Sequence, residues 1–432
     1  MAEARFAVAA LPRHFPVPSP SAAPRPLLSS IDRQTRTFQL DAARGLMDGV
    51  VQSALQTVAL LIAVRVFQAP DPLKALIAAG PFVGNMLSLF YSALLSNVGV
   101  SKARLASLPL LAAAAFLAGA AFSTQSLAFA LLVTGANAAF MLRVTFLAGV
   151  YQENYVAARR GALFGRGLLF SIVSGLVASF AFGGVLDRDL SDYGWVLGAA
   201  AAASLVSAVC VRAMPSTPPG TREHTNPFRN LGLAFRDRAF GYILFVWFVF
   251  GFANLALAPL RIVYLAEAER GLHLSPLSVL VIAGVLVEAA RLLFTPLWAW
   301  WFDRMNFVVL RMILNVFLAA GTVTFFASEN PIVIGAGSLL TGIGYAGGGV
   351  AWNLWVIRLA PPGTTHVYMS VHTFLTGVRG ILGPYLGFVL LDHLGWQELS
   401  WLSAAAIALS IVMLAPAVGS GRLAAPVRRA AE

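Results

Sequence analysis

Charged residues are scarce in this chain. They make up 11% of its 432 residues, whereas a soluble globular domain carries about 25%. Apolar residues account for 58% of the sequence, and the mean hydropathy is +0.77. Water therefore cannot be the main solvent of this protein, and we expect most of the chain to lie in a lipid bilayer.

Cysteine is almost absent as well. Cys210 is the single cysteine and lies in an apolar run, so we exclude an intramolecular disulfide and interpret the residue as part of the packing. The six histidines are scattered without metal-ligand spacing. No Gly-x-x-x-x-Gly-Lys-Ser/Thr loop is present. We therefore expect no metal, no cofactor and no enzymatic site, and we exclude an ATP-driven pump.

The N-terminal segment contains no signal-peptide core and no small-residue cleavage site. It is rich in Pro, Ala and Arg, so we expect a disordered cytoplasmic tail over residues 1–43. Without a removable signal, the first membrane helix itself must direct insertion.

Long apolar runs predict twelve membrane helices, because a helix needs about 20 apolar residues to cross about 30 Å of hydrocarbon. The candidate spans lie at approximately 45–67, 74–96, 105–124, 126–150, 162–186, 193–213, 240–266, 276–302, 307–327, 331–357, 368–391 and 398–420. The longest polar interruption is 214–238, and Pro215, Pro218, Pro219 and Gly220 in its first part break any continuing helix. We predict an all-α membrane protein with two six-helix bundles, 44–213 and 239–420, a cytoplasmic linker at 214–238 and a tail at 421–432.

Charge tests this layout independently. If the N-terminus is cytoplasmic, 22 of the 30 Lys and Arg residues fall on inside segments and 3 on outside loops. Such an excess predicts that both termini are cytoplasmic, and we expect a multi-pass protein of the cell (inner) membrane. Because the basic residues recur in short loops and not in one patch, we expect no nucleic-acid partner.

Two loops, 92–104 and 299–311, repeat one element about 207 residues apart. Each loop ends one long apolar run and opens the next. In register, Ser96 matches Asp303 and Arg104 matches Arg311. Parallel repeats of this kind place a binding site between the two halves, near the middle of the bilayer. The repeat therefore favours a membrane transporter.

Over about residues 40–420, this plan resembles the major facilitator superfamily. The second loop keeps the charged core of the family's Gly-x-x-x-Asp-Arg motif, although Ala299 replaces the glycine. In the fifth span, Ser179 and Phe180 replace the Gly-Pro of the family's antiporter signature, so this motif does not support drug/proton antiport. The resemblance implies gating or motif roles for Lys102, Arg104, Arg160, Gly161, Asp303, Arg304, Arg311, Arg379, Gly383 and Pro384.

Charges inside spans are expensive and are functional hypotheses by default. Asp48 lies four residues before Gln52, which lies four before Gln56, so the three share a helix face. One interpretation is a cavity-lining stripe with Asp48 as a proton or cation site. The other is a carboxylate that complements the dipole at the helix N-terminus.

Other span charges carry similar alternatives. Glu288 is spaced for an intrahelical pair with Arg291, which is either structural or a coupling carboxylate with a moving partner. The resemblance implies that the fourth span lines the cavity, so Arg143 is the expected substrate ligand. Arg65 and Arg261 lie near span ends, where we expect them to snorkel.

These observations together predict a secondary transporter that works by alternating access. The excess of span arginines over acids favours a small organic anion or zwitterion, with proton coupling through Asp48 or through Glu288 and Arg291. The alternatives are an efflux pump for apolar compounds and a lipid flippase on the same fold. We expect a monomer whose partners are a small-molecule substrate and the lipid bilayer. The predicted substrate-binding residues are Asp48, Gln52, Gln56, Asn137, Arg143, Asn254, Tyr345, Trp352 and Asn353.

Overall fold

The computed structural model describes residues 30–95, 98–219, 232–302, 304–360 and 365–419. Every regular element within these ranges is a helix. Twelve helical segments are long and apolar enough to cross a membrane. The predicted all-α membrane fold is confirmed, and all described spans except the first begin close to the predicted positions.

The described residues of the first half form eight α-helices and two short irregular helices. They are α1 (Ser30–Ser53), the π-helix η1 (Ala54–Val58), α2 (Ala59–Arg65), α3 (Asp71–Leu95), α4 (Lys102–Ala121), α5 (Ser126–Leu142), α6 (Val144–Asn154), α7 (Ala157–Arg188), η2 (Leu190–Asp192) and α8 (Tyr193–Arg212). The first span is formed by α1, η1 and α2 in sequence, and the fourth by α5 and α6.

The second half follows the same plan after the linker. Its elements are α10 (Leu233–Arg236), α11 (Arg238–Leu257), α12 (Leu260–Ala266), α13 (Pro276–Leu280), the π-helix η3 (Val281–Val285), α14 (Leu286–Phe302), α15 (Phe307–Phe326), α16 (Pro331–Leu359), α17 (Thr365–Leu391), α18 (Trp396–Leu414) and η4 (Ala415–Ala417). The seventh span joins α11 to α12, and the eighth joins α13, η3 and α14.

The first helix begins earlier than the composition suggests. The expectation of a disordered tail over residues 1–43 is wrong for residues 30–43, which are helical from Ser30 onward. Thr37 and Asp41 are fully buried there, and the Tyr151 hydroxyl donates to Asp41 Oδ1 at 2.5 Å. Tertiary contacts with α6 therefore stabilise a segment that looks polar in sequence; residues 1–29 lie outside the described residues.

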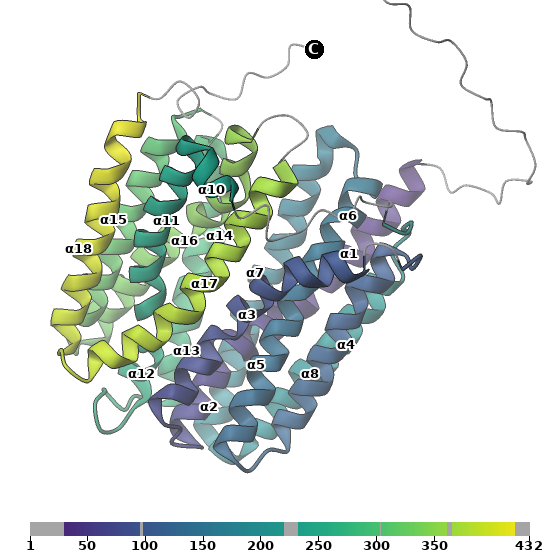
Figure 1. Ribbon diagram of the computed structural model, residues 1–432. Coiled ribbons are helices and arrows are strands. Elements are labelled where there is room, and N and C mark those ends of the chain that lie inside the picture. Colours follow the sequence, from purple (N-terminus) through teal and green to yellow (C-terminus); the bar gives the residue numbers. More distant parts are fainter. Residues whose placement is uncertain (1–29, 96–97, 220–231, 303, 361–364, 420–432) are drawn as a thin grey trace, which may run out of the picture.

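Figure 1 shows two groups of helices, α1–α8 in purple to blue and α11–α18 in teal to yellow. The first helix begins and the last helix ends at one end of the molecule, which we call the termini side (Figure 1). We call the opposite end, where α2 and α12 end, the network side. Between the groups, α3 packs against α17, and α7 packs against α13 and α14. These contacts surround the middle of the molecule.

Glycine permits the closest of these approaches. A Cβ atom on Gly380 of α17 would lie 2.1 Å from the Phe82 ring of α3. Likewise, a Cβ on Gly387 would lie 2.2 Å from the carbonyl oxygen of Ala256 on α11. Small residues let helix backbones pack closely where lipid supplies no hydrophobic drive. Gly380 and Gly387 therefore let α17 pack closely against helices of both halves.

Several helices are irregular near the centre of the molecule. Both π-helices, η1 and η3, interrupt spans there, and Pro81 and Pro384 lie within α3 and α17. Proline and π-bulges kink helices, and π-bulges frequently mark functional sites. All four irregular positions border the cavity described next.

Candidate functional site

A cavity of about 440 Å³ lies between the two halves. Its size falls within the range of about 300–1,000 Å³ that is typical of small-molecule sites. Apolar residues such as Leu55, Phe82 and Val287 form part of the wall. The polar residues on the wall are Gln52, Ser53, Gln56, Thr57, Asn85, Asn137, Ser171, Ser179, Arg261, Glu288, Arg291, Ser338 and Tyr345.

The structure brings six of the predicted site residues together around this cavity: Gln52, Gln56, Asn137, Glu288, Arg291 and Tyr345. The side chains from the first half are neutral amides, which donate and accept hydrogen bonds. Those from the second half are charged or phenolic. The two halves therefore supply different chemistry to one space.

Two predicted site residues, Asn254 and Trp352, do not line the cavity. Asn254 accepts a hydrogen bond from the Tyr345 hydroxyl at 3.4 Å, which positions the phenol. Trp352 packs in the core of the second half, with its ring 5.1 Å from that of His372. The side chain of Asn353 lies outside the described residues.

Glu288 and Arg291 form an ion pair on the cavity wall. Arg291 Nη1 donates to Glu288 Oε1 at 2.5 Å, and the side chains are 26% and 22% exposed, respectively. Both lie on α14, one turn apart. The carboxylate is therefore within reach of the cavity contents and has a single cationic partner on its own helix.

Asp48 and Arg143, which the sequence predicts as cavity-lining residues, are not on the wall. They are only 1% and 5% exposed and pair with each other, because Arg143 Nε and Nη2 donate to Asp48 Oδ2 at 3.1 and 2.9 Å. The hydroxyl of Ser207 on α8 donates to Asp48 Oδ1 at 2.6 Å. The prediction for these two residues is corrected: each neutralises the other inside the first half.

The same buried network continues along α1. Arg44 donates to Asp48 and to Asp41 Oδ1, the latter at 2.8 Å. Two carboxylates thus face two guanidinium groups, Arg44 and Arg143, and the charges balance. Balanced, hydrogen-bonded charges are the form in which ions are tolerated away from water.

Arg261 lines the cavity although the sequence suggests that it snorkels to the membrane surface. It is 8% exposed, and Pro259 begins the short helix α12 just before it. Its Nη2 donates to Thr322 Oγ1 at 3.1 Å. The sequence holds one signal for this position, its place on a span that lines the cavity in the resembled family.

The predicted motif residues of the first half lie on the termini side. Lys102 forms an ion pair with Glu153 at 3.4 Å, and Arg104 is exposed. Arg160 donates to the Gln152 carbonyl at 3.1 Å, and the space around Gly161 is open. Lys102 therefore joins α4 to α6 and stabilises the first helix bundle.

In the second half, Asp303 lies outside the described residues. The Arg304 guanidinium lies 4.2 Å from the Trp300 ring. Arg311 is buried between Trp247 and Phe250, at 4.2 Å from each ring centroid. Arg379 donates to the Trp247 carbonyl and to Thr376 Oγ1 at 3.1 Å. Gly383 packs against α11, and Pro384 lines the cavity.

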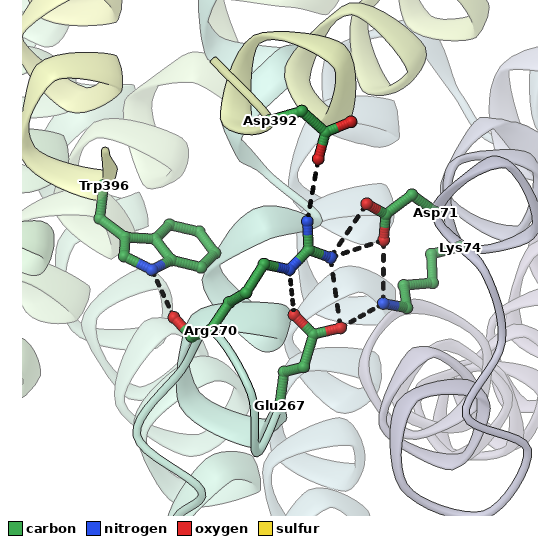
Figure 2. A network of polar contacts seen from close by, with 6 residues as sticks. All are labelled: Asp71, Lys74, Glu267, Arg270, Asp392 and Trp396. Carbon is green, nitrogen blue, oxygen red and sulfur yellow. Dashed lines mark hydrogen bonds and ion pairs between the residues drawn. The ribbon is translucent and has the colours of Figure 1, made fainter. Parts of the chain in front are cut away.

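A network of charged side chains joins the halves on the network side (Figure 2). Arg270 Nη2 donates to both carboxylate oxygens of Asp71, at 2.8 and 2.9 Å, and Lys74 donates to Glu267. Asp71 and Lys74 belong to α3, whereas Glu267 and Arg270 follow α12. Arg270 also bonds within its own half, to Glu267 at 2.9 Å and to Asp392 at 3.2 Å. Burial lowers the pKa of Arg270, but its carboxylate partners Asp71 and Glu267 raise it above the ordinary value overall.

Further contacts join the halves at the same end. Arg65 Nη1 bonds to the His273 ring nitrogens at 2.8–2.9 Å, and the backbone N–H of Leu277 donates to Asp187 Oδ1 at 3.2 Å. These bonds, like those of Asp71 and Lys74, join the two halves on the network side. This side is therefore closed in the present conformation.

Several solved structures share this fold. The nucleoside transporter NupG superposes with a TM-score of 0.68 at 12% identity, covering 89% of this chain and 98% of that chain. The xylose transporter XylE from E. coli, in a partially occluded inward-open conformation, gives 0.66 at 14%, covering 89% and 97%. A POT family transporter in complex with a thioalcohol-conjugated peptide gives 0.68 at 9%, covering 89% and 96%. At such identities, the likeness establishes the fold.

Family membership rests on the sequence itself. A search of curated proteins finds no match. The family model of the Major Facilitator Superfamily matches residues 45–384, and the described part of the chain has twelve helices long and apolar enough to span a membrane, which fits the twelve-span type of that family. This protein therefore belongs to the major facilitator superfamily and is a multi-pass membrane transporter of small molecules, not an enzyme.

Proposed function

We propose that the protein is a secondary active transporter that moves a small organic anion or zwitterion by alternating access, coupled to protons. The cavity carries this proposal, because both halves line it and its wall combines amides, a phenol and three charged groups. A pump for apolar compounds or a lipid flippase would not need the charged side chains of Arg261, Glu288 and Arg291 on this wall.

Glu288 supports the coupling role better than Asp48. It lies on the cavity wall and has one cationic partner, Arg291, on the same helix. Asp48 receives hydrogen bonds from two guanidinium groups and a serine hydroxyl away from the wall. Protonating Asp48 would leave Asp41 as the one carboxylate facing the buried guanidinium groups of Arg44 and Arg143, with one positive charge uncompensated. Protonating Glu288 would release one side chain into the cavity.

The polar network of Figure 2 supplies a gate for alternating access. The positive-inside pattern favours cytoplasmic termini in the inner membrane, which makes the network side the external one. In this proposal the present conformation is closed to the outside. To open it, the pairs that Asp71 and Lys74 form across the interface must break.

The function is tested in proteoliposomes that contain the purified protein and an imposed proton gradient. Expected results are gradient-driven uptake of at least one small carboxylate or zwitterion from a metabolite panel, and its loss when the gradient is collapsed. Uptake that ignores the gradient would exclude proton coupling. Movement of apolar dyes or fluorescent lipids, with no uptake of any polar solute, would favour the two alternative functions.

Replacing Asp71 with asparagine should shift the protein toward a state open on the network side. The change removes a carboxylate that Arg270 and Lys74 share, and we expect a population shift of about 5- to 150-fold, the usual range of conformational coupling. The measurement is the labelling rate of Ala78→Cys on the cavity wall, in a Cys210→Ser background, by an impermeant maleimide added from the network side.

Asp392→Asn is the matched control for this experiment. Asp392 pairs with Arg270 in the same network at 3.2 Å, but both residues belong to the second half. Its removal should leave the labelling rate unchanged. Equal acceleration by Asp392→Asn and Asp71→Asn, or no acceleration by either, would show that the network does not hold the halves together.

A further inference from the structure

Arg261 is the uncompensated charge of the cavity. The charged residues on the wall are Arg261, Glu288 and Arg291. Glu288 and Arg291 neutralise each other at 2.5 Å. Two positive charges and one negative charge therefore leave a net charge of +1, and Arg261 carries it.

The guanidinium of Arg261 also has unused hydrogen-bonding capacity. Arginine carries five N–H donors, yet the described partner of Arg261 is a single neutral hydroxyl, Thr322 Oγ1 at 3.1 Å. Its Nε is buried without a hydrogen-bond partner, and the described residues include no acid in ion-pair contact with it. A charge in such a place normally has a partner. Here the missing partner can enter from the cavity.

Its surroundings hold the side chain in place. Thr322 on α15 anchors one nitrogen, and the Phe325 ring lies 5.4 Å from the guanidinium carbon. Other buried arginines are engaged differently: Arg143 is neutralised by Asp48, and Arg311 is enclosed between two aromatic rings away from the wall. Arg261 combines burial, a free donor and a position on the cavity wall.

We propose that Arg261 binds the carboxylate of a monoanionic organic solute in this cavity. The inference rests on the proposed transport function and narrows its substrate to one negative charge, because the cavity carries a single net positive charge while Glu288 is ionised. Guanidinium groups bind carboxylates in bidentate fashion. The amides of Gln52, Gln56 and Asn137, on the opposite half, supply donors and acceptors for the solute's neutral polar groups.

The test is calorimetric titration of the purified full-length protein with matched pairs of probes. The probes are lactate, gluconate, benzoate and nicotinate, each paired with its primary amide, and succinate as a dianion. We expect the wild-type protein to bind at least one monocarboxylate more tightly than its amide and more tightly than succinate. Arg261→Gln should weaken that binding by about 30-fold or more and leave amide binding unchanged. Arg261→Lys keeps the positive charge but loses the bidentate guanidinium geometry, so its affinity for the carboxylate should fall between those of the wild-type protein and Arg261→Gln.

Arg212→Gln serves as the control, because Arg212 is exposed at the end of α8, and it should bind like the wild-type protein. The inference is overturned if Arg261→Gln binds the carboxylate as tightly as the wild-type protein does, or if the wild-type protein prefers the amides or binds none of the acids. Uptake of an amide into proteoliposomes that contain Arg261→Gln distinguishes failure of the carboxylate site from failure of the proposed transport function. Such uptake upholds the transport function whatever becomes of the carboxylate site.

Discussion

Replacing Asp48 with alanine should destabilise the protein more than any single change on the cavity wall. The substitution removes the carboxylate that Arg44 and Arg143 share and leaves both cations buried in the first half. Breaking a buried ion pair by removing one partner costs about 3–5 kcal/mol. We expect a correspondingly large fall in the thermal unfolding midpoint of the detergent-solubilised protein, followed by circular dichroism.

Two further variants separate charge from hydrogen bonding at Asp48. Ser207→Ala removes one hydrogen bond to the same carboxylate and should cost only about 1 kcal/mol. Combining Asp48→Ala with Arg143→Gln should cost less than the sum of the two single changes, because the second substitution removes a cation that the first has stranded. If Asp48→Ala destabilised the protein no more than Ser207→Ala does, the carboxylate of Asp48 would not be holding the network together.

The twelve spans could be predicted from sequence because lipid imposes their length. Hydrocarbon about 30 Å thick requires about 20 apolar residues in each helix, and helices begin at the predicted Ser126, Pro276, Phe307 and Pro331. At three of these starts, side chains of the preceding residues Ser275, Asn306 and Asn330 cap the helix. Local chemistry and the solvent therefore fix these boundaries together.

The direction of individual side chains could not be predicted in the same way. Asp48 and Gln52 are four residues apart and were expected on one face, yet Gln52 lines the cavity and Asp48 does not. The hydrogen-bond partners of Asp48 decide the difference. These partners are Arg143 and Ser207, which lie 95 and 159 residues away in the chain. The periodicity of the sequence predicts which residues share a helix face, whereas tertiary partners determine where each side chain on that face points.

Arg261 illustrates the same limit. A position near the end of an apolar run suggests snorkelling, but the break at Ala258 and Pro259 starts a new helix just before it. Both of these residues and Arg261 itself line the cavity. The sequence shows the proline, whereas only the packed structure shows that the bend lies beside a polar cavity.

Glu288→Gln should abolish concentrative uptake while leaving exchange of substrate across the membrane intact. In the wild-type protein, a proton on Glu288 would release Arg291 from their 2.5 Å pair and raise the net charge of the cavity as an anion enters. With one coupled proton, a gradient of one pH unit supports roughly tenfold accumulation. Because glutamine mimics the neutral acid permanently, accumulation should fall to the level reached without a gradient.

The measurement compares gradient-driven uptake with counterflow in proteoliposomes, using the carboxylate that the wild-type protein transports. Glu398→Gln is the control, because Glu398 is exposed on α18, and it should accumulate substrate as the wild-type protein does. Persistent tenfold accumulation by Glu288→Gln would remove Glu288 from the coupling step. If Glu288→Gln lost both counterflow and accumulation, Glu288 would instead be assigned to substrate binding. Exchange needs an intact cavity but no net proton movement.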